Sequence, residues 1–374
     1  MLYYRREIMD LPSELKITDD LVLASPLILA PMSGVTDAAF RSLIFKENEI
    51  GIGMMVTEFV SVEALTRKNQ RCAQMMKFQQ HERPISIQIF GYDVDRMVQA
   101  AEMAEEAGAD MLDINCGCPV PKVVRRGGGA ELMRQPEHLR KIISAIKRTV
   151  KIPIGVKIRA GWDEAHKNAI EIAKLAEDEG AGLLTIHART KVQGYSGKID
   201  YAIVERVCGE ISIPVVGSGD IYDIQGVKFY FDLGAKGAMI GRAALKNPWI
   251  FKDIFCAICG KKESSGFNVP PEQIISPKQS GLTGQAIVLK KDAECQEENF
   301  EEQAEIKYAA VVRVLTDYSL LLRNNSLSEN AVLGRLKQLV AQVTKGQVGG
   351  TKLRAALCKA KTVEQFFEEL KGNL

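Results

Sequence analysis

Residues Ala109-Asp-Met-Leu-Asp-Ile-Asn-Cys-Gly-Cys-Pro119 form the stretch that best indicates the fold. It starts as a largely apolar run, turns to polar and reactive side chains, and ends in Pro119, which prevents simple continuation of a strand. A buried parallel strand has this pattern when it delivers reactive groups to the carboxyl face of an α/β fold. We therefore expect Asn115 to offer an amide there and Cys118 a thiol.

The Cys118 thiol has two interpretations at this point. An isolated cysteine is most often a buried structural residue. With an ordinary pKa of about 8.5, however, a thiol is mostly protonated near neutral pH and can donate a proton. The residues around Cys118 favour the second interpretation.

Short apolar runs alternate with helical patterns between residues 27 and 255. This alternation predicts parallel strands joined by right-handed crossovers. Eight repeats favour an α/β fold of the (β/α)8 TIM-barrel type, with a doubly wound open sheet as the alternative. The predicted strands are Leu27–Met32, Gly53–Thr57, Ile85–Phe90, Met111–Asn115, Ile154–Ile158, Leu183–His187, Ile213–Gly217 and Gly237–Ile240. We also expect a hairpin at Leu15–Leu23 and helices at Val94–Ala107 and Asn168–Glu179.

The 374 residues are enough for a barrel and a smaller second domain. The pattern predicts a catalytic barrel over residues 1–255 and a linker or insertion over 256–300, where Gly, Ser, Pro, Lys and Glu replace the periodicity. A small all-helical domain follows over 301–374. Its expected helices are Ala309–Leu322, Ala331–Lys345 and Thr362–Leu370, each with an apolar stripe.

The composition is that of a soluble globular protein, with 46% hydrophobic and 26% charged residues. No apolar run approaches the roughly 20 residues of a membrane span, and residues 1–7 lack the apolar region of a signal peptide. We therefore expect no membrane association, a cytoplasmic location and a monomer. Eight cysteines without a dense framework indicate free thiols. A metal or iron–sulfur site at Cys256 and Cys259, with Cys295 and Cys358, is a minor alternative because no second close pair exists.

Nearly every predicted strand ends in polar or glycine-rich residues, and in a barrel these ends converge on one face. Strands seven and eight end in Gly217-Ser-Gly-Asp220 and Gly241-Arg242. Such short loops let backbone N–H groups approach an anion, and Arg242 complements a phosphate. Glycines needed only for tight turns are the alternative at either loop.

Other strand ends suit the flat ring of a flavin mononucleotide. The stretch Ala30-Pro31-Met32-Ser33-Gly34 closes the first strand with a stiff proline and small residues, which suits backbone lying against a flat ring. Gln88 and Asn115 offer neutral amides, and Lys157 offers a cation near the barrel centre. With the phosphate loops, they predict an FMN site.

Two of these assignments have structural alternatives. Lys157 could form an ion pair with Glu58 or Asp113 inside the barrel. His187 could be a satisfied core histidine, but Arg189 beside it at a strand end favours a ligand contact.

On these residues, the chain resembles the tRNA-dihydrouridine synthases, flavoproteins that reduce particular uridines of tRNA. The matching stretches occur in the family's order: Ala30-Pro-Met-Ser-Gly-Val-Thr-Asp37, Gln88-Ile-Phe-Gly91, Asp113-Ile-Asn-Cys-Gly-Cys-Pro119, Val156-Lys-Ile-Arg-Ala-Gly-Trp162, Thr185-Ile-His-Ala-Arg-Thr190, Gln193-Gly-Tyr-Ser-Gly197, Gly217-Ser-Gly-Asp-Ile221 and Met239-Ile-Gly-Arg-Ala-Ala244.

The resemblance implies FMN as cofactor, NADPH as reductant and tRNA as substrate. It implies hydride transfer from reduced FMN to C6 of uracil and protonation of C5 by Cys118, the cysteine before the proline. The positions that match flavin contacts are Pro31, Met32, Ser33, Gln88, Lys157, Ser218, Gly219, Asp220, Gly241 and Arg242, and the positions around flavin and uracil are Asn115, His187 and Arg189. Two departures are Ser218, where the family usually has Asn, and a longer segment at 260–300.

The charge of the C-terminal part fits an RNA substrate. Residues 306–361 hold ten Lys or Arg and two acids, a net charge of +8 in a chain of +2. Such a surplus is typical of a surface for a polyanion, although a solvated helical face is the alternative. Arg335 and Lys337 lie on a helix placed like the family's RNA-binding domain, and Lys122, Arg125 and Arg126 add charge beside the Cys118 loop. A uridine in folded RNA must leave its stack to be reduced.

Two other functions remain open from the sequence. One is a flavin barrel acting on a free small molecule, similar to dihydroorotate dehydrogenase, which would not need a basic helical domain. The other is a non-enzymatic RNA-binding protein on a decayed barrel, which the intact strand ends argue against.

Overall fold

The computed structural model describes residues 11–260, 300–346 and 349–372, with the side chains from residue 308 onward in the second part. The chain forms two compact units, one built by the described residues before 261 and the other by those after 299. No helix in the described ranges is both long and apolar enough to cross a membrane.

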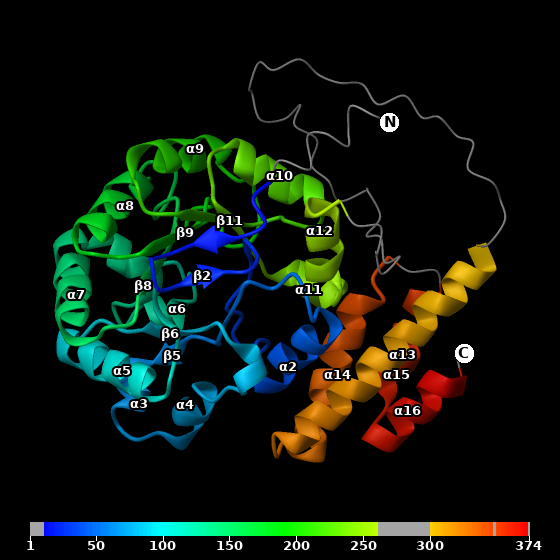
Figure 1. Ribbon diagram of the computed structural model, residues 1–374. Coiled ribbons are helices and arrows are strands. Elements are labelled where there is room, and N and C mark those ends of the chain that lie inside the picture. The colour runs from blue at the N-terminus through cyan, green and yellow to red at the C-terminus, as the bar shows by residue number, and fades with distance from the viewer. Residues whose placement is uncertain (1–10, 261–299, 347–348, 373–374) are drawn as a thin grey trace. The chain divides into compact units, whose positions relative to one another are not determined.

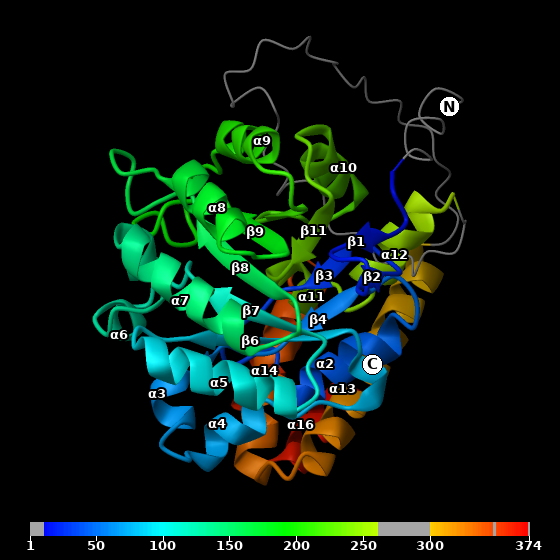
Figure 2. The same ribbon diagram turned by 60° about the vertical axis from the view of Figure 1, so that its left-hand side comes forward.

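The first unit is a closed barrel of parallel strands (Figures 1 and 2). Strand β11 pairs with β3, which closes the ring, so the predicted TIM barrel is confirmed and the open sheet is wrong. The barrel strands are β3 (Leu27–Leu29), β4 (Met54–Val56), β6 (Ile85–Phe90), β7 (Met111–Asn115), β8 (Ile154–Arg159), β9 (Leu183–His187), β10 (Val215–Ser218) and β11 (Gly237–Ile240). A two-residue strand, β5 (Val60–Ser61), extends the pairing at the end of β6.

Helices surround the strands (Figure 2). They are α2 (Ala38–Glu47), α3 (Val62–Leu65), α4 (Gln70–Met75), α5 (Val94–Glu106), α6 (Pro121–Val124), α7 (Pro136–Thr149), α8 (Ala169–Asp178), α9 (Tyr201–Glu210), α10 (Ile224–Asp232), α11 (Arg242–Lys246) and α12 (Ile250–Ile258). Helix α5 shows why these segments pack on the barrel, because Met97, Ala100, Ala101 and Ala104 recur at helical spacing and are fully buried.

The predicted hairpin exists as β1 (Leu15–Lys16) and β2 (Val22–Leu23), in which Leu15 pairs with Leu23. Leu15, Ile17 and Leu23 join one apolar cluster with barrel residues such as Met111 and Val216. These barrel residues lie toward the amino ends of their strands, so the hairpin helps to fill that end and leaves the carboxyl end for the site.

The second unit consists of α13 (Phe300–Asn324), α14 (Glu329–Val343), α15 (Gly350–Lys359) and α16 (Val363–Gly372). Three of these helices were predicted. Helix α15 was not predicted, because it begins at glycines and is only ten residues long, so its buried leucines, Leu353 and Leu357, do not form a long apolar stripe. Leu336, Val340, Leu357 and Phe366 are buried in this unit.

The minor alternative of a metal or iron–sulfur site at Cys256 and Cys259 has no support among the described residues. Cys256 is buried in α12, Cys259 is exposed just after it, and Cys295 lies outside the described residues. Among those residues, no group of three or more His, Cys, Asp or Glu side chains is arranged to hold a metal ion.

Gly217, in strand β10, packs closely against Tyr230, and its substitution tests this packing. A Cβ at this position would lie 2.0 Å from Cδ1 of the buried Tyr230 ring. We expect Gly217→Ala to lower the free energy of unfolding by about 1–3 kcal/mol, measured by urea denaturation. Gly209→Ala in α9 is the matched control, because nothing lies within 4 Å of its added Cβ. This control should leave stability equal or higher, and equal effects of the two substitutions would contradict the packing argument.

Candidate active site

A cavity of about 500 Å³ opens at the carboxyl ends of the barrel strands. Twelve of the predicted site residues line it: Pro31, Met32, Ser33, Asn115, Cys118, Lys157, His187, Ser218, Gly219, Asp220, Gly241 and Arg242. Gln88 and Arg189 lie behind this lining and contact it. Lys122 does not line the cavity, and Arg335 and Lys337 belong to the helical unit.

Cys118 lies in the cavity wall on a loop fixed by Asn115. The Oδ1 atom of Asn115 accepts hydrogen bonds from the backbone N–H of Gly117 at 3.1 Å and of Cys118 at 2.9 Å. The Nδ2 atom of Asn115 donates to Oε1 of Gln88 at 2.7 Å. The Asn115 amide is therefore engaged in holding the loop, and Gln88 holds Asn115.

The Cys118 thiol stays protonated near neutral pH. Burial raises its pKa above the usual value, with smaller opposing effects from the Val120 backbone and the charge of Arg159. The side chain of Cys116, two residues away, does not line the cavity and is fully buried, and burial raises its pKa much further. Of these two cysteines, only Cys118 can therefore present its thiol proton to a molecule in the cavity.

Asp113 is buried inside the barrel and interacts electrostatically with Lys157, which lines the cavity. Burial raises the pKa of Asp113 to about 6, although hydrogen bonding from Gln88 and the charge of Lys157 oppose the shift. Burial likewise lowers the pKa of Lys157 to about 8. Gly155 makes room for this arrangement, because a Cβ there would lie 2.8 Å from Oδ1 of Asp113.

His187 is a neutral imidazole. Burial, followed by the charges of Arg159, Lys157, Arg189 and Arg242, holds its pKa well below the usual value. Its Nε2 lies 3.3 Å from Nη1 of Arg189, which can only donate, so the proton of the ring is assigned to Nδ1.

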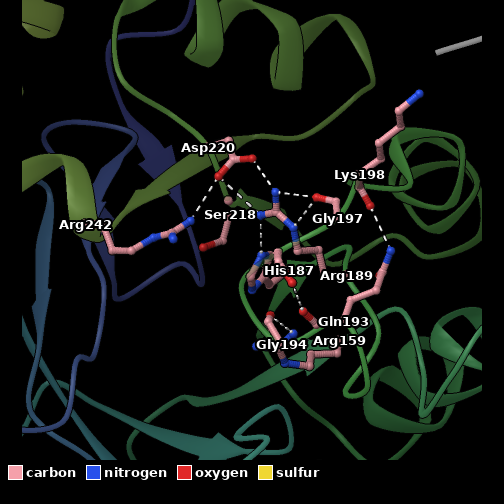
Figure 3. Close-up of polar contacts among 12 residues, drawn as sticks. Arg159, His187, Arg189, Gln193, Gly194, Gly197, Lys198, Ser218, Asp220 and Arg242 are labelled. Carbon is pink, nitrogen blue, oxygen red and sulfur yellow. Dashed lines mark hydrogen bonds and ion pairs between the residues drawn. The ribbon is translucent and has the colours of Figure 1, made fainter. Parts of the chain in front are cut away.

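Asp220 joins two arginines at the end of β10 (Figure 3). Its carboxylate accepts from Nη2 of the buried Arg189 at 2.5 Å and from Nη2 of the half-exposed Arg242 at 3.1 Å. Tyr230 supports the same loop, since its hydroxyl donates to the carbonyls of Ser218 at 2.8 Å and Gly219 at 3.0 Å.

The loop after β10 leaves space for an anion. Gly219 has a φ of +112°, and a Cβ there would lie 2.7 Å from Cδ2 of His187. The Ser218 hydroxyl has no hydrogen-bond partner among the described residues, and Ser218 lines the cavity. Backbone at Gly219, a free hydroxyl and the Arg242 guanidinium suit a phosphate.

Arg159 and Tyr195 belong to the site but were not among the predicted site residues. Arg159 donates to the carbonyls of Gly117 at 2.6 Å and Gly194 at 2.7 Å, so it ties the Cys118 loop to the loop after β9. Tyr195, 59% exposed, lies between Arg159 and Arg242, whose guanidinium carbons are 5.5 and 5.6 Å from its ring centre. Both positions could have been predicted from the sequence, because Arg159 ends strand β8 and Tyr195 lies in the family motif Gln193-Gly-Tyr-Ser-Gly197.

Two cations of the basic segment 306–361, one of them the predicted RNA-binding residue Lys337, make internal contacts in the helical unit. Nζ of Lys337 donates to the Ala360 carbonyl at 2.5 Å, and Arg354 donates to the Thr344 carbonyl at 2.7 Å. Among the described residues of this unit, the exposed cations whose ammonium groups form no hydrogen bond or ion pair are Lys345, Lys352, Lys359, Lys361 and Lys371.

A closed parallel barrel with a cavity at the carboxyl ends of its strands, lined by cations and a thiol, is typical of a barrel enzyme. The chain matches the dihydrouridine synthase (Dus) family over residues 28–332. It is 39% identical over 247 residues to a "Probable tRNA-dihydrouridine synthase" of Rhodobacter capsulatus, which covers 66% of this chain and 75% of that protein. The chain therefore belongs to the dihydrouridine synthase family and is an oxidoreductase.

Two further relatives give the same result. A "Probable tRNA-dihydrouridine synthase" of Mycobacterium tuberculosis is 40% identical over 248 residues, which cover 64% of each chain. The tRNA-dihydrouridine synthase B of Vibrio parahaemolyticus is 40% identical over 233 residues, covering 62% of this chain and 71% of that protein.

The raised pKa of Asp113 has a consequence for stability. A carboxyl whose pKa is higher in the folded state destabilises the fold as it ionises, so its contribution declines as pH rises from about 4 through 6. We expect Asp113→Asn, which cannot ionise, to gain stability relative to the wild type over that range. Urea unfolding at several pH values measures the difference, and a constant difference would show that Asp113 does not titrate in this window.

Proposed function

We propose that this protein reduces specific uridines of tRNA to 5,6-dihydrouridine, with FMN as cofactor and NADPH as reductant. The observation that carries the proposal is the protonated Cys118 thiol in the wall of a cationic cavity, in a chain of the dihydrouridine synthase family.

The residues present fit FMN. Met32, Ala30 and Met239 give one side of the cavity an apolar wall, which suits a flat ring. Gly219, Ser218 and Arg242 form the cradle for a phosphate, and a Cβ at Gly219 would fill part of it. These residues would hold FMN, and its reduced form would be the source of the hydride for C6 of the uracil.

The chain's own residues then supply the proton and the charge stabilisation. Cys118 protonates C5 of the uracil, and Asn115 holds the backbone that positions its thiol. Lys157 lines the cavity and makes no hydrogen bond to the described residues, so its ammonium is available to negative charge that develops on the uracil carbonyl. General acid catalysis of this kind contributes roughly 10²–10⁴ in rate.

The exposed lysines of the helical unit support tRNA over a small-molecule substrate. We propose the domains 1–255 for catalysis, 256–300 as linker and 301–374 for tRNA binding. Arg335 and Lys337 remain in the proposed RNA surface, although Lys337 also contacts Ala360 within the unit. A small-molecule reductase would show no tRNA binding in a gel-shift experiment, which separates the two functions.

Removal of the Cys118 thiol tests the mechanism. We expect Cys118→Ala to retain FMN and its reduction by NADPH, but to slow oxidation of the reduced enzyme by unmodified tRNA by roughly 10² or more. Anaerobic stopped-flow absorbance measures each step. The matched control, Cys116→Ala, should leave the tRNA step nearly intact, since Cys116 does not line the cavity. Wild-type rates and dihydrouridine yields with Cys118→Ala would assign the proton to another group.

Replacement of Arg242 tests the cofactor. We expect the purified protein to contain one FMN and Arg242→Ala to retain it less well, because a cation near the phosphate is lost. Flavin per protein is measured by absorbance after dialysis. Arg148→Ala, on the outer helix α7, should behave as wild type. Folded wild-type protein that neither contains nor binds FMN would disprove the cofactor assignment.

A further inference from the structure

A second cavity, of about 780 Å³, opens next to the first on the barrel unit. Two walls separate the cavities. Phe59 lines the first and Phe90 the second, and their rings meet edge to face at 5.2 Å. The loop with α6 forms the other wall, because Val120 lines the first cavity and Val123 the second.

The acids of the second cavity are already engaged. Glu63 forms ion pairs with Arg67 and, at 3.2 Å, with Arg96. The Asp93 carboxylate accepts from the backbone N–H of Arg96 and so caps the start of α5. Glu63 is therefore neutralised by its arginines, and Asp93 forms no ion pair with the cations at the edge of the cavity.

Cations without a carboxylate partner among the described residues lie on α6 and directly after it. Arg126 lines the second cavity, and Lys122 lies one helical turn before it; both are exposed and neither has a carboxylate partner among the described residues. Arg125 contacts only the Pro121 carbonyl, at 3.3 Å. Asn69, across the cavity, uses its Oδ1 to cap α4 and keeps its amide N–H groups without a partner in that same set. The polar groups that remain without a partner here, on Lys122, Arg126 and the Asn69 amide, are all hydrogen-bond donors.

The loop that carries these cations is also the loop that positions Cys118. Gly127 packs on Tyr92, since an added Cβ would lie 2.4 Å from Cδ2 of that ring, and Tyr92 stacks on His138 at 4.0 Å. Gly129, with a φ of +60°, packs against Cys118, whose carbonyl accepts from the Ala130 N–H at 3.1 Å. Donors on a fixed loop bind an anion with little loss of conformational freedom.

We infer that α6 and the second cavity bind the phosphate groups of nucleotides that flank the uridine in the first cavity. This inference rests on the proposed function. Val120, 44% exposed between the cavities, offers an apolar contact where the RNA passes from one to the other. Phosphate contacts of this kind fix the register of a nucleic acid without reading its sequence, so the α6 loop would set which nucleotide reaches Cys118.

The test is the salt dependence of tRNA binding by the full-length protein. We expect the double variant Lys122→Gln/Arg126→Gln to bind unmodified tRNA about ten-fold more weakly at roughly 0.1 M salt, and the slope of log K against log salt to fall by about 1.5 for two lost phosphate contacts. Lys151→Gln/Lys236→Gln is the matched control. Both of these lysines are exposed and precede strands β8 and β11, at the amino end of the barrel, and the same loss of charge there should leave affinity and slope unchanged.

Each outcome decides between the alternatives. Equal affinity and slope for the α6 variant and the wild type would overturn the inference while leaving the proposed function intact. If both double variants bind tRNA equally weakly, the loss of affinity comes from the change in net charge alone, and the inference is also wrong. If tRNA binding is unchanged and only reduction by NADPH slows, the phosphate is that of the dinucleotide and the inference is wrong. Wild-type protein that does not bind tRNA would contradict the proposed function itself.

Discussion

The register of the parallel strands is the constraint on which the site depends. Gln88 pairs with Asp113, Asn115 with Lys157, Arg159 with His187, and Ser218 also with His187. Paired residues of parallel strands face the same side of the sheet, so this register turns an amide, an ammonium, an imidazole and a hydroxyl to the inside of the barrel near the carboxyl ends of its strands. A shift by one residue in any of these strands would turn its polar side chain into the apolar layer under the helices.

Burial makes this polar layer costly and gives it its chemistry. Asp113 and Lys157 each have a pKa shifted toward the neutral form, and His187 remains neutral among four cations. An isolated charge is expensive in such a place unless it is paired. Asp220 meets that need for Arg189 and Arg242, while Lys157 stays available to a ligand.

The loop of Cys118 is held by residues both near it and distant from it in sequence. Asn115 binds its backbone N–H, Ala130 binds its carbonyl, and Arg159 binds the carbonyl of Gly117. Arg159 also reaches Gly194, so the Cys118 loop and the Tyr195 loop are joined through one guanidinium. The α6 cations lie on the same loop, which links the proposed RNA contacts to the position of the proton donor.

The sequence by itself determined the barrel, the helical unit and most of the residues lining the cavity, because strand periodicity and polar strand ends are local features of the chain. It did not reveal α15, whose apolar positions are too few to stand out, or the engagement of Asn115, Lys337 and Arg354 in internal hydrogen bonds. The sequence also did not show that Arg159 joins the Cys118 loop to the Tyr195 loop, because this depends on contacts between segments that are distant in the chain. Which donor meets which acceptor depends on the side chains that folding brings together, and only the tertiary structure decides that.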